Sequence, residues 1–304
     1  MTFRNIAIIG LGLLGGSIGL AVCAHLPDAA TTGFDADPAT RERAAARKLV
    51  GTVFDSAAEA VRNSDLVILC VPVGAMAEAA AEMAEALPAG AVVSDVGSSK
   101  ESVLKALAKA LPGATIIPAH PVAGTENSGP EAGFASLFQN RWCIITPPED
   151  ANPAQVFALS EFWQALGANV EIMTPAHHDL VLAVTSHLPH LIAYTIVGTA
   201  SDLEHVTRSE VIKYSAGGFR DFTRIAASDP TMWRDVFLTN KDAVLEMLQR
   251  FTEDLTELQK AIRKDDGTAL FDHFTRTRAV RRSIIEQGQD DARPDFGRSD
   301  HNGG

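Results

Sequence analysis

The sequence predicts an α/β fold in which an N-terminal, doubly wound sheet is followed by an all-α domain. Three observations support this prediction. Short apolar runs alternate with helix-forming segments up to about residue 173, a glycine-rich turn follows the first apolar run, and strand patterns stop after Pro175. We therefore expect an α/β domain at residues 1–174, a helical domain at 175–288 and a disordered tail at 289–304.

Seven short apolar runs are the candidate strands of the first domain. The run from Leu66 to Val71 is apolar at every position, which is typical of a central parallel strand covered by helices on both faces. Segments rich in Ala and Glu lie between the runs, for example at 75–87 and 100–111, and favour helices with one apolar stripe. The seven runs are 6–10, 32–35, 66–72, 91–95, 115–119, 143–146 and 170–173.

Helical periodicity dominates the rest of the chain. Segments 176–200, 231–263 and 269–286 carry long apolar patterns without the alternation of a strand. Pro189 should kink the first of them, because proline removes a backbone donor and clashes with the preceding turn. The glycines within 216–219 predict a flexible loop.

Composition limits the partners and the compartment. The 304 residues include 26 Lys and Arg against 38 Asp and Glu, a formal net charge of −12, so we expect neither nucleic acid nor an anionic membrane as a partner. Apart from the glycine-interrupted N-terminal run, we expect no segment able to span a bilayer. Cys23, Cys70 and Cys143 lack CxxC spacing, which favours buried free thiols in a reducing, cytoplasmic setting and no metal site.

The first apolar run leads into a candidate dinucleotide site. Gly10 would permit the tight turn, Gly12 would let the backbone approach a pyrophosphate, and Gly15 would allow the helix to pack closely on the strand. Together with the flanking strand and helix, this pattern is the Rossmann fingerprint. The alternative is a glycine turn that binds no nucleotide. We expect the cofactor also to contact Leu13, Leu14, Val71 and Pro72.

Asp35 ends the second candidate strand, 20 residues beyond Gly15, which is the spacing of an acid that binds a ribose 2′-hydroxyl. A carboxylate there repels a 2′-phosphate, and no Arg follows it directly, so NAD is favoured over NADP as the cofactor. The alternative is that Asp35 only caps the helix that begins near Pro38, a role that suits Asp37 better.

Two polar clusters follow strands, where ligands bind in open α/β sheets. His120 is the candidate general base, because an imidazole near its ordinary pKa can accept a proton at neutral pH. Ser98 is the candidate hydroxyl that orients the substrate oxygen. The alternative for His120 is a structural histidine at a strand end.

The helical domain contributes two further clusters. His187 and His190 lie near one helical face, where a substrate contact or plain burial is favoured over a metal. Three Arg and Trp233 surround the glycines at 217–218, a pattern that indicates a carboxylate clamp with an aromatic wall, or alternatively a charged surface helix.

Five motifs occur in order and resemble the prephenate/arogenate (cyclohexadienyl) dehydrogenase family of tyrosine biosynthesis. They are GLGLLGGS at 10–17, DVGSSK at 95–100, HPVAGTENSG at 120–129, TSHLPH at 185–190 and GGFRDFTRIAASDPTMWRD at 217–235. The resemblance spans about residues 6–245. It implies a Rossmann domain, a helical domain that builds a homodimer, and NAD-dependent oxidative decarboxylation of prephenate, arogenate or both.

The resemblance also implies roles for individual residues. His120 would be the catalytic base and Ser98 its hydrogen-bonding serine, while Arg224 would bind a substrate carboxylate. Further substrate contacts are implied at His190, His187, Asp221, Trp233, Gly217, Thr125 and Glu126.

Two rival functions stay open on the sequence. A β-hydroxyacid dehydrogenase would place a catalytic lysine in the helical domain, where Lys213 and Lys241 are candidates without a supporting motif. A non-catalytic NAD-sensing protein is the other rival. The choice between prephenate and arogenate, feedback inhibition by tyrosine, and which of His187 and His190 contacts the substrate are not decided by these motifs.

Overall fold

The computed structural model describes residues 3–125, 127–202 and 217–286, so Glu126, Lys213 and the expected tail lie outside the described residues. The chain divides into two compact units, Met1–Met247 and Leu248–Gly304. The first unit continues past residue 174 because α7 (Pro175–Leu182) packs on α5 (Glu101–Ala110) and α11 (Pro230–Thr239) packs on η1 (Val73–Ala75). The limits 1–174 and 175–288 remain a division drawn from the sequence.

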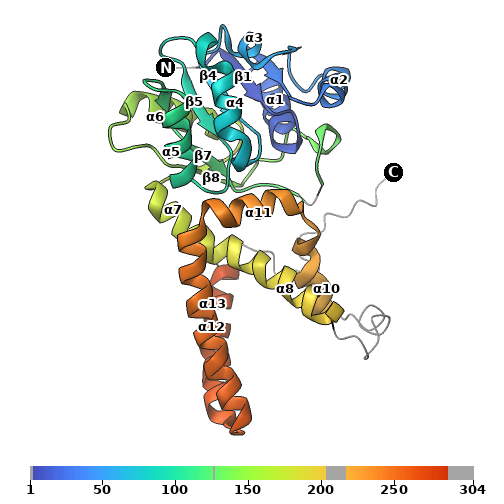
Figure 1. Cartoon of the computed structure of the whole chain (residues 1–304), viewed down its shortest axis with the longest axis vertical. Helices are drawn as coiled ribbons and strands as arrows, with labels where there is room; N and C mark the ends of the chain where they lie inside the picture. The colour runs from blue at the N-terminus through green and yellow to red at the C-terminus, as the bar shows by residue number, and fades with distance from the viewer. Residues whose placement is uncertain (1–2, 126, 203–216, 287–304) are drawn as a thin grey trace. The chain divides into compact units, whose positions relative to one another are not determined.

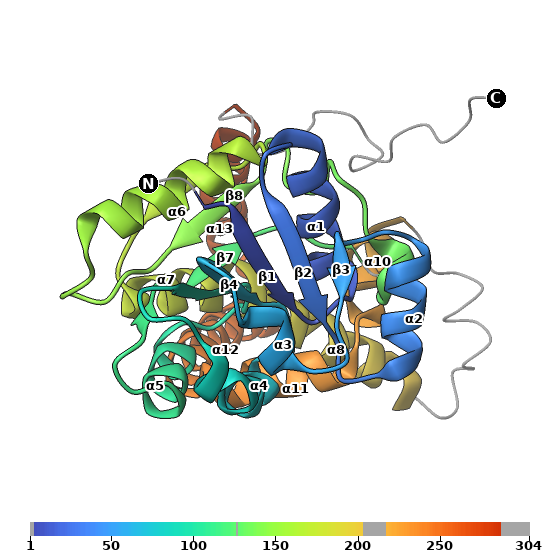
Figure 2. The same ribbon diagram turned by 90° about the horizontal axis from the view of Figure 1, so that it is seen from above.

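The first sheet has six parallel strands in the order β3-β2-β1-β4-β5-β6 (Figures 1 and 2). This is the Rossmann order, and the reversal between β1 and β4 places a ligand crevice at their carboxyl ends. The sequence predicted five of these strands and missed β3, which is only two residues long. The strands are β1 (Asn5–Ile9), β2 (Ala30–Phe34), β3 (Thr52–Val53), β4 (Leu66–Leu69), β5 (Val92–Asp95) and β6 (Thr115–Ile116).

A second sheet of three strands, β7 (Ala119–Pro121), β8 (Trp142–Ile145) and β9 (Asn169–Ile172), corrects the prediction of one continuous doubly wound sheet. The predicted strand at 115–119 is divided because the β6 pairing ends at Ile116 and the chain then joins β8 in antiparallel register, with His120 opposite Ile144. Proline at 118 has no N–H to continue a ladder. His120 therefore lies within a strand of a different sheet and not at the end of a parallel one.

The described residues also contain twelve α-helices and five short helical segments of about one turn. The α-helices are α1 (Leu13–His25), α2 (Pro38–Ala46), α3 (Ala57–Val61), α4 (Met76–Met83), α5 (Glu101–Ala110), α6 (Pro153–Ala165), α7 (Pro175–Leu182), α8 (Leu188–Asp202), α10 (Gly217–Thr223), α11 (Pro230–Thr239), α12 (Lys241–Arg263) and α13 (Gly267–Glu286). The short segments are η1 (Val73–Ala75), η2 (Ala84–Ala86), η3 (Pro130–Ala132), η4 (Ala183–His187) and η5 (Arg224–Ala227), of which η4 is π-helical.

Four of these helices begin with the same local signal, a capping side chain followed by proline. The side chains of Asp37, Asn152, Thr174 and Asp229 each accept a backbone N–H of the first turn, and a proline occupies the next position. Proline suits that position because its missing N–H would have no partner there. Asp37 is thus the cap of α2, as the sequence favoured.

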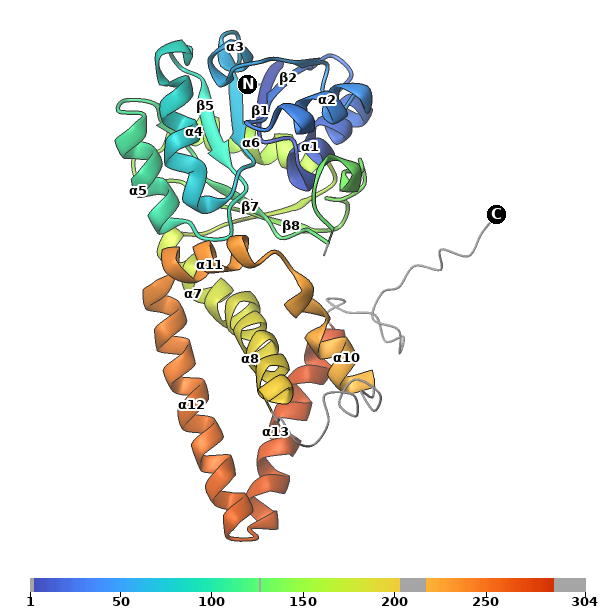
Figure 3. The same ribbon diagram turned by 45° about the vertical axis from the view of Figure 1, so that its right-hand side comes forward.

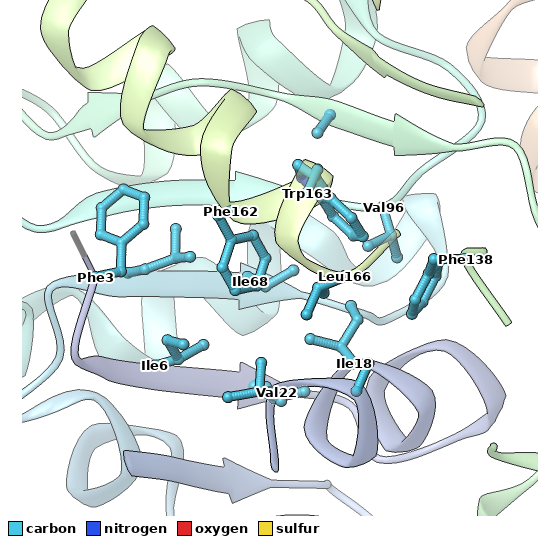
Figure 4. Close-up of a cluster of buried hydrophobic side chains, with 14 of the residues drawn as sticks. Phe3, Ile6, Ile18, Val22, Ile68, Val96, Phe138, Phe162, Trp163 and Leu166 are labelled. Carbon is cyan, nitrogen blue, oxygen red and sulfur yellow. The ribbon is translucent and has the colours of Figure 1, made fainter. Parts of the chain in front are cut away.

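Both faces of the parallel sheet are buried, which explains the uniformly apolar strands. Side chains of β1 alternate between the two faces: Ile6 and Ile8 belong to a cluster with α1 and α6, while Ala7 and Ile9 belong to one with α3, α4 and α5. Figure 4 shows the first cluster, in which rings from α6 pack over the sheet beside α1. Helix and sheet are held together mainly by this apolar burial.

The helical region departs from prediction in three places. The predicted helix at 176–200 is interrupted by η4, whose wider turn directly precedes the helix that holds Pro189. The predicted helix at 231–263 breaks at Asn240 between α11 and α12. The expected loop at 216–219 is wrong from Gly217 onward, because Gly217 begins helix α10, and Ala216 lies outside the described residues.

Two further expectations are corrected. The run Pro175–Asp202 is long and apolar enough to cross a membrane by length and composition, although none was expected beyond the N-terminal run. Its His178, Asp179 and His187 are buried polar side chains that are hydrogen-bonded to neighbouring elements. All three cysteines are free, as expected, but only Cys143 is buried, because Cys23 is exposed and Cys70 is half-buried.

Within the second unit, α12 and α13 run in opposite directions and are joined by a short turn (Figure 3). Asp265 adopts a left-handed conformation with φ 53° in this turn. Several large apolar side chains are exposed on the two helices, among them Leu255, Ile262, Phe271 and Phe274.

Candidate active site

The glycine-rich turn between β1 and α1 has the backbone that a dinucleotide needs. Gly10 has φ +100°, and a Cβ there would lie 2.5 Å from the carbonyl oxygen of Cys70. A Cβ on Gly15 would lie 1.9 Å from the carbonyl oxygen of Gly10. By contrast, nothing lies within 4 Å of a Cβ on Gly12, so its backbone faces open space at the start of the helix. The tight turn expected at Gly10 and the close packing expected at Gly15 are observed, whereas the approach of a pyrophosphate to Gly12 stays a prediction.

The N-terminus of α1 is left uncapped. Gly12 supplies no side-chain cap, and the first turn, with the half-buried Leu13 and Leu14, contains no acidic residue. Unpaired N–H groups at a helix start carry partial positive charge and favour a phosphate group. The half-buried Val71 and exposed Pro72 follow β4, the strand next to β1.

Asp35 follows β2 and fixes the edge of this crevice. One carboxylate oxygen accepts the N–H of Leu11 at 2.8 Å and the other accepts the N–H of Asp37 at 3.0 Å. Each oxygen has a further lone pair for a ribose hydroxyl. Asp35 thus does not cap α2, and Arg41, which donates to the carbonyl of Asp35 at 2.8 Å, is the cation beside it.

His120 lies in β7 with 8% of its surface exposed, and its Nδ1 is 2.9 Å from Nε2 of His178. His178, in α7, in turn has its Nδ1 2.8 Å from Oδ1 of Asp179. Among the described residues, Nε2 of His120 has no hydrogen-bond partner. The two imidazoles and the carboxylate therefore form a line that ends in one open ring nitrogen.

The carboxylate of Asp179 also binds the start of α5. Oδ1 accepts the N–H of Lys100 at 2.7 Å, and Oδ2 accepts the N–H of Glu101 at 3.0 Å. These bonds provide a tertiary cap for α5, whose preceding residue supplies no side-chain cap. Asp179 is consequently held from two elements and is only 3% exposed.

Lys100 joins the start of α5 to strand β7. Its side chain is fully buried, and its Nζ is hydrogen-bonded to Asp95 and, at 2.8 Å, to the carbonyl of Ala119. Ala119 directly precedes His120, so the ammonium fixes the backbone that carries the imidazole. Asp95 also accepts the N–H of Gly97 at 2.8 Å, which shapes the turn that contains Ser98.

Burial decides the protonation of the histidines. Burial lowers the pKa of His120 well below 6.5, with further lowering from His178 and His187 whenever those rings are protonated and from Lys100. Burial also lowers the pKa of His178, although its hydrogen bond to Asp179 opposes the shift. Both rings are therefore neutral at pH 7, and His120 can accept a proton there.

His187 is fully buried and occupies the centre of the site. Its Nδ1 is 3.0 Å from Nδ2 of Asn240, which also donates to the carbonyl of Asp179 at 2.8 Å. Because an amide nitrogen only donates, Nδ1 of His187 must accept and its proton must lie on Nε2. Burial lowers the pKa of His187 to about 4. Among the described residues, Nε2 of His187 is buried without a hydrogen-bond partner, and a substrate contact at His187 stays a prediction.

His190 is the histidine on the more open side. It is half-buried and stacks on Trp233, with ring centroids 3.7 Å apart. Its pKa is lowered first by burial and also by the nearby positive charge of Arg224, which places Arg224 close to His190. Trp233 also lies edge-on to His187, at 6.1 Å between centroids.

The structure brings together six of the ten residues predicted for catalysis and substrate binding, namely His120, Ser98, His187, His190, Trp233 and Arg224. The electrostatic neighbours run from His120 to His187, from His187 to His190 and from His190 to Arg224. Ser98 is half-buried and its backbone faces His187, but no hydrogen bond joins Ser98 to His120 among the described residues.

Other predicted residues stand farther out. Asp221 is half-buried on α10, 3.6 Å from Arg220, and Gly217 begins the same helix. Thr125 is exposed in a loop, where its hydroxyl accepts the N–H of Asn127 at 3.2 Å. Lys241, a candidate of the rival dehydrogenase class, is exposed at the start of α12.

Comparisons with known proteins agree with this architecture. The prephenate dehydrogenase nucleotide-binding domain matches residues 18–172, and the prephenate dehydrogenase dimerization domain matches residues 174–276. Cyclohexadienyl dehydrogenase of Zymomonas mobilis is 47% identical over 93% of this chain and 96% of its own length. Prephenate dehydrogenase of Bacillus subtilis is 33% identical over 89% of this chain and 73% of its own. The chain belongs to the prephenate dehydrogenase family.

The same family is found among solved structures. The crystal structure of prephenate dehydrogenase from A. aeolicus in complex with hydroxyphenyl propionate and NAD+ has a TM-score of 0.86 to this chain, at 32% identity, covering 93% of this chain and 99% of that one. The resemblance predicted from five motifs, the dehydrogenase class and the division into a Rossmann and a helical part are thereby confirmed.

Three buried residues of this family member escaped the sequence-based prediction. Lys100 was part of a quoted motif but was not assigned a role, and His178 and Asp179 were not considered. The available signal was a His-Asp pair at the start of a helix that is otherwise strongly apolar. Buried polar side chains in such a helix need partners, so they indicate a network.

Proposed function

We propose that this chain catalyses the NAD-dependent oxidative decarboxylation of prephenate, arogenate or both. The observation that carries the proposal is the environment of His120, a buried neutral imidazole with Nδ1 engaged by His178 and Nε2 left open. The fit of the glycine turn to a dinucleotide and the names of the relatives support it.

The turn of Gly10, Gly12 and Gly15 would hold NAD, which when bound would supply the acceptor for the hydride that leaves C4 of the substrate ring. His120 accepts the proton of the C4 hydroxyl at Nε2. The ring carboxylate leaves as CO2, and the gain of aromaticity makes the step effectively irreversible. Ser98 and the stacked pair His190 and Trp233 are proposed to orient the ring.

Arg224 is proposed to bind a substrate carboxylate. A guanidinium forms strong, paired hydrogen bonds with a carboxylate, and a local cation is needed in a chain with net charge −12. Arg224 is exposed, and its closeness to His190 places it on the open side of the cluster.

The test of the base is His120→Asn. We expect turnover to fall by about 100- to 10,000-fold, the usual scale for the loss of a general base, while NAD affinity measured by fluorescence quenching stays unchanged. His177→Gln, at an exposed histidine of the same helix as His178, is the matched control. Near-normal turnover of the Asn variant would remove His120 from this role.

The test of the clamp is Arg224→Ala. We expect the KM for the ring substrate to rise by about 10- to 100-fold, because a charge-assisted hydrogen bond is lost, with a smaller change in kcat. Arg43→Ala, an exposed arginine on α2, is the control. Assays with prephenate and arogenate, each with NAD and NADP, would also assign the preferred substrate and cofactor.

A homodimer in the cytoplasm is part of the proposal. Residues 174–276 match a dimerization domain, and within the second unit Phe271 and Phe274 are 69% and 57% exposed. Burial of such side chains against a second copy is the expected outcome. Light scattering should give a dimer for the parent and a monomer for the double variant Phe271→Glu/Phe274→Glu, with Asp272→Asn unchanged; a dimeric double variant would contradict this interface.

A further inference from the structure

We propose that His178 and Asp179 form a positioning relay that fixes the tautomer of His120 and receives the positive charge when His120 takes up a proton. The inference rests on the proposed function of His120 as the base. The distances that define the relay are 2.9 Å from His120 Nδ1 to His178 Nε2 and 2.8 Å from His178 Nδ1 to Asp179 Oδ1.

The direction of each hydrogen bond follows from the carboxylate. An ionised carboxylate only accepts, so Nδ1 of His178 must carry a proton and donate to Asp179. In the neutral ring Nε2 of His178 then bears a lone pair, so Nδ1 of His120 must donate to it. Nε2 of His120 is consequently the unprotonated nitrogen, and it is the one without a partner among the described residues. The relay selects the tautomer that can act as a base.

The same line gives the proton a path. When Nε2 of His120 accepts the substrate proton, the proton on Nδ1 can pass to Nε2 of His178. The cation then lies on His178, 2.8 Å from the carboxylate of Asp179, and His120 returns to a neutral ring. The substrate O–H bond and the Nδ1–H bond of His120 break, and the Nε2–H bonds of His120 and His178 form, so two protons each move by one position and the net result is one positive charge on His178. A charge that would be costly on the enclosed His120 is thus placed beside an anion.

Further hydrogen bonds hold the residues of the relay in place. Asp179 accepts the N–H groups of Lys100 and Glu101 at 2.7 and 3.0 Å, and Lys100 Nζ binds the carbonyl of Ala119 at 2.8 Å. Since Ala119 precedes His120 in the chain, the contacts close a ring through both imidazoles. His178 is fully buried, so its ring has no access to solvent and its two nitrogens are engaged by His120 and Asp179.

Other charges face the two rings. Lys100, at the start of α5, opposes a positive charge on either histidine, and His187, from η4, opposes one on His120. Asp179 from α7 and Asp95 from β5 favour a cation on His178. The anions therefore lie on the His178 side of the pair, which is the side to which the relay sends the proton.

Two substitutions separate positioning from charge transfer. His178→Gln can accept from Nδ1 of His120 and donate to Asp179, but it cannot carry a proton; His178→Phe can do neither. We expect kcat to fall about 10- to 100-fold in His178→Gln, because the positive charge must then stay on the buried His120, and further in His178→Phe, where Nδ1 of His120 also loses its hydrogen bond. The KM for NAD should stay unchanged. His177→Gln is the control.

Nitrogen-15 NMR of histidine-labelled enzyme reads the tautomer without turnover. The resting parent should show a pyridine-type Nε2 and a pyrrole-type Nδ1 for His120, identified by the signals lost in His120→Asn. In His178→Phe the two tautomers of His120 should both be populated. The opposite tautomer in the parent would overturn the inference, as would kcat within twofold of the parent in both His178 variants. An active His120→Asn enzyme would instead overturn the proposed function.

Discussion

His187 should make the stability of the protein depend on pH in a way that one substitution can isolate. The ring is fully buried, and burial lowers its pKa from 6.5 to about 4 despite the opposing influence of Asp179. Because the folded state disfavours the protonated ring, the stability contribution is complete above the unfolded pKa. It is lost as the pH falls from 6.5 toward 4 and then levels off.

The size of the effect follows from the two pKa values. At pH 5 the ring is almost fully protonated in the unfolded chain and still mostly neutral in the folded one, which lowers the free energy of unfolding by about 2 kcal/mol relative to pH 7.5. Below pH 4 the loss approaches about 3 kcal/mol. The lowered pKa values of His120, His178 and His190 add losses of the same sign. The contribution of His187 alone is therefore obtained as the difference in unfolding free energy between the parent and a variant that lacks this imidazole.

The perturbation is His187→Gln, whose amide oxygen can replace Nδ1 as acceptor for Asn240 but does not titrate. Urea unfolding followed by tryptophan fluorescence, at one protein concentration and at several pH values from 7.5 to 5, gives the free energy at each pH. The parent should lose about 2 kcal/mol more than the variant across this range. The exposed control His177→Gln should follow the parent. Parallel curves for the parent and His187→Gln would refute the assigned burial and pKa.

Three further predictions concern the nucleotide crevice and its support. Gly15→Ala should raise the Kd for NAD at least about tenfold, because its Cβ would lie 1.9 Å from the carbonyl oxygen of Gly10; calorimetry that finds unchanged affinity would contradict the close packing. Asp35→Asn should lower the preference for NAD over NADP in kcat/KM by about 10- to 100-fold, since a charged hydrogen-bond acceptor is lost, and an unchanged ratio would exclude it as the ribose ligand. Lys100→Met should lower the free energy of unfolding by about 3–5 kcal/mol, because the fully buried Asp95 is left without its cation. Urea titrations at pH 7 measure this loss, and a value below about 1 kcal/mol would show that the two residues are not a buried charge pair.

The sequence was sufficient for the Rossmann domain because its signals are local. The glycines at 10, 12 and 15 encode a backbone path, apolar strands encode burial on both faces, and Asp37 and Thr174, each followed by proline, encode the starts of two helices. The ordered motifs likewise identified the family. Each of these features depends on residues that are close together in the chain, so the local sequence is enough to predict it.

The sequence was insufficient wherever two polar groups separated by many residues had to meet. The sequence does not distinguish His187 from His190, yet His187 is enclosed beside Asn240 and His190 stacks on Trp233. The strand that carries His120 was placed in the wrong sheet, because pairing with Ile144 is a long-range contact that no local pattern records.

What the sequence alone determined is the order of elements, the dinucleotide turn and the identity of His120, Ser98 and Arg224 as candidates, since these follow from local backbone preferences and recurring motifs. Only the tertiary structure decided that His178 and Asp179 line up behind His120 and that Lys100 joins α5 to β7. The physical reason is that a hydrogen bond between buried groups depends on distances of about 3 Å between segments 58 to 79 residues apart, which packing of the whole domain sets.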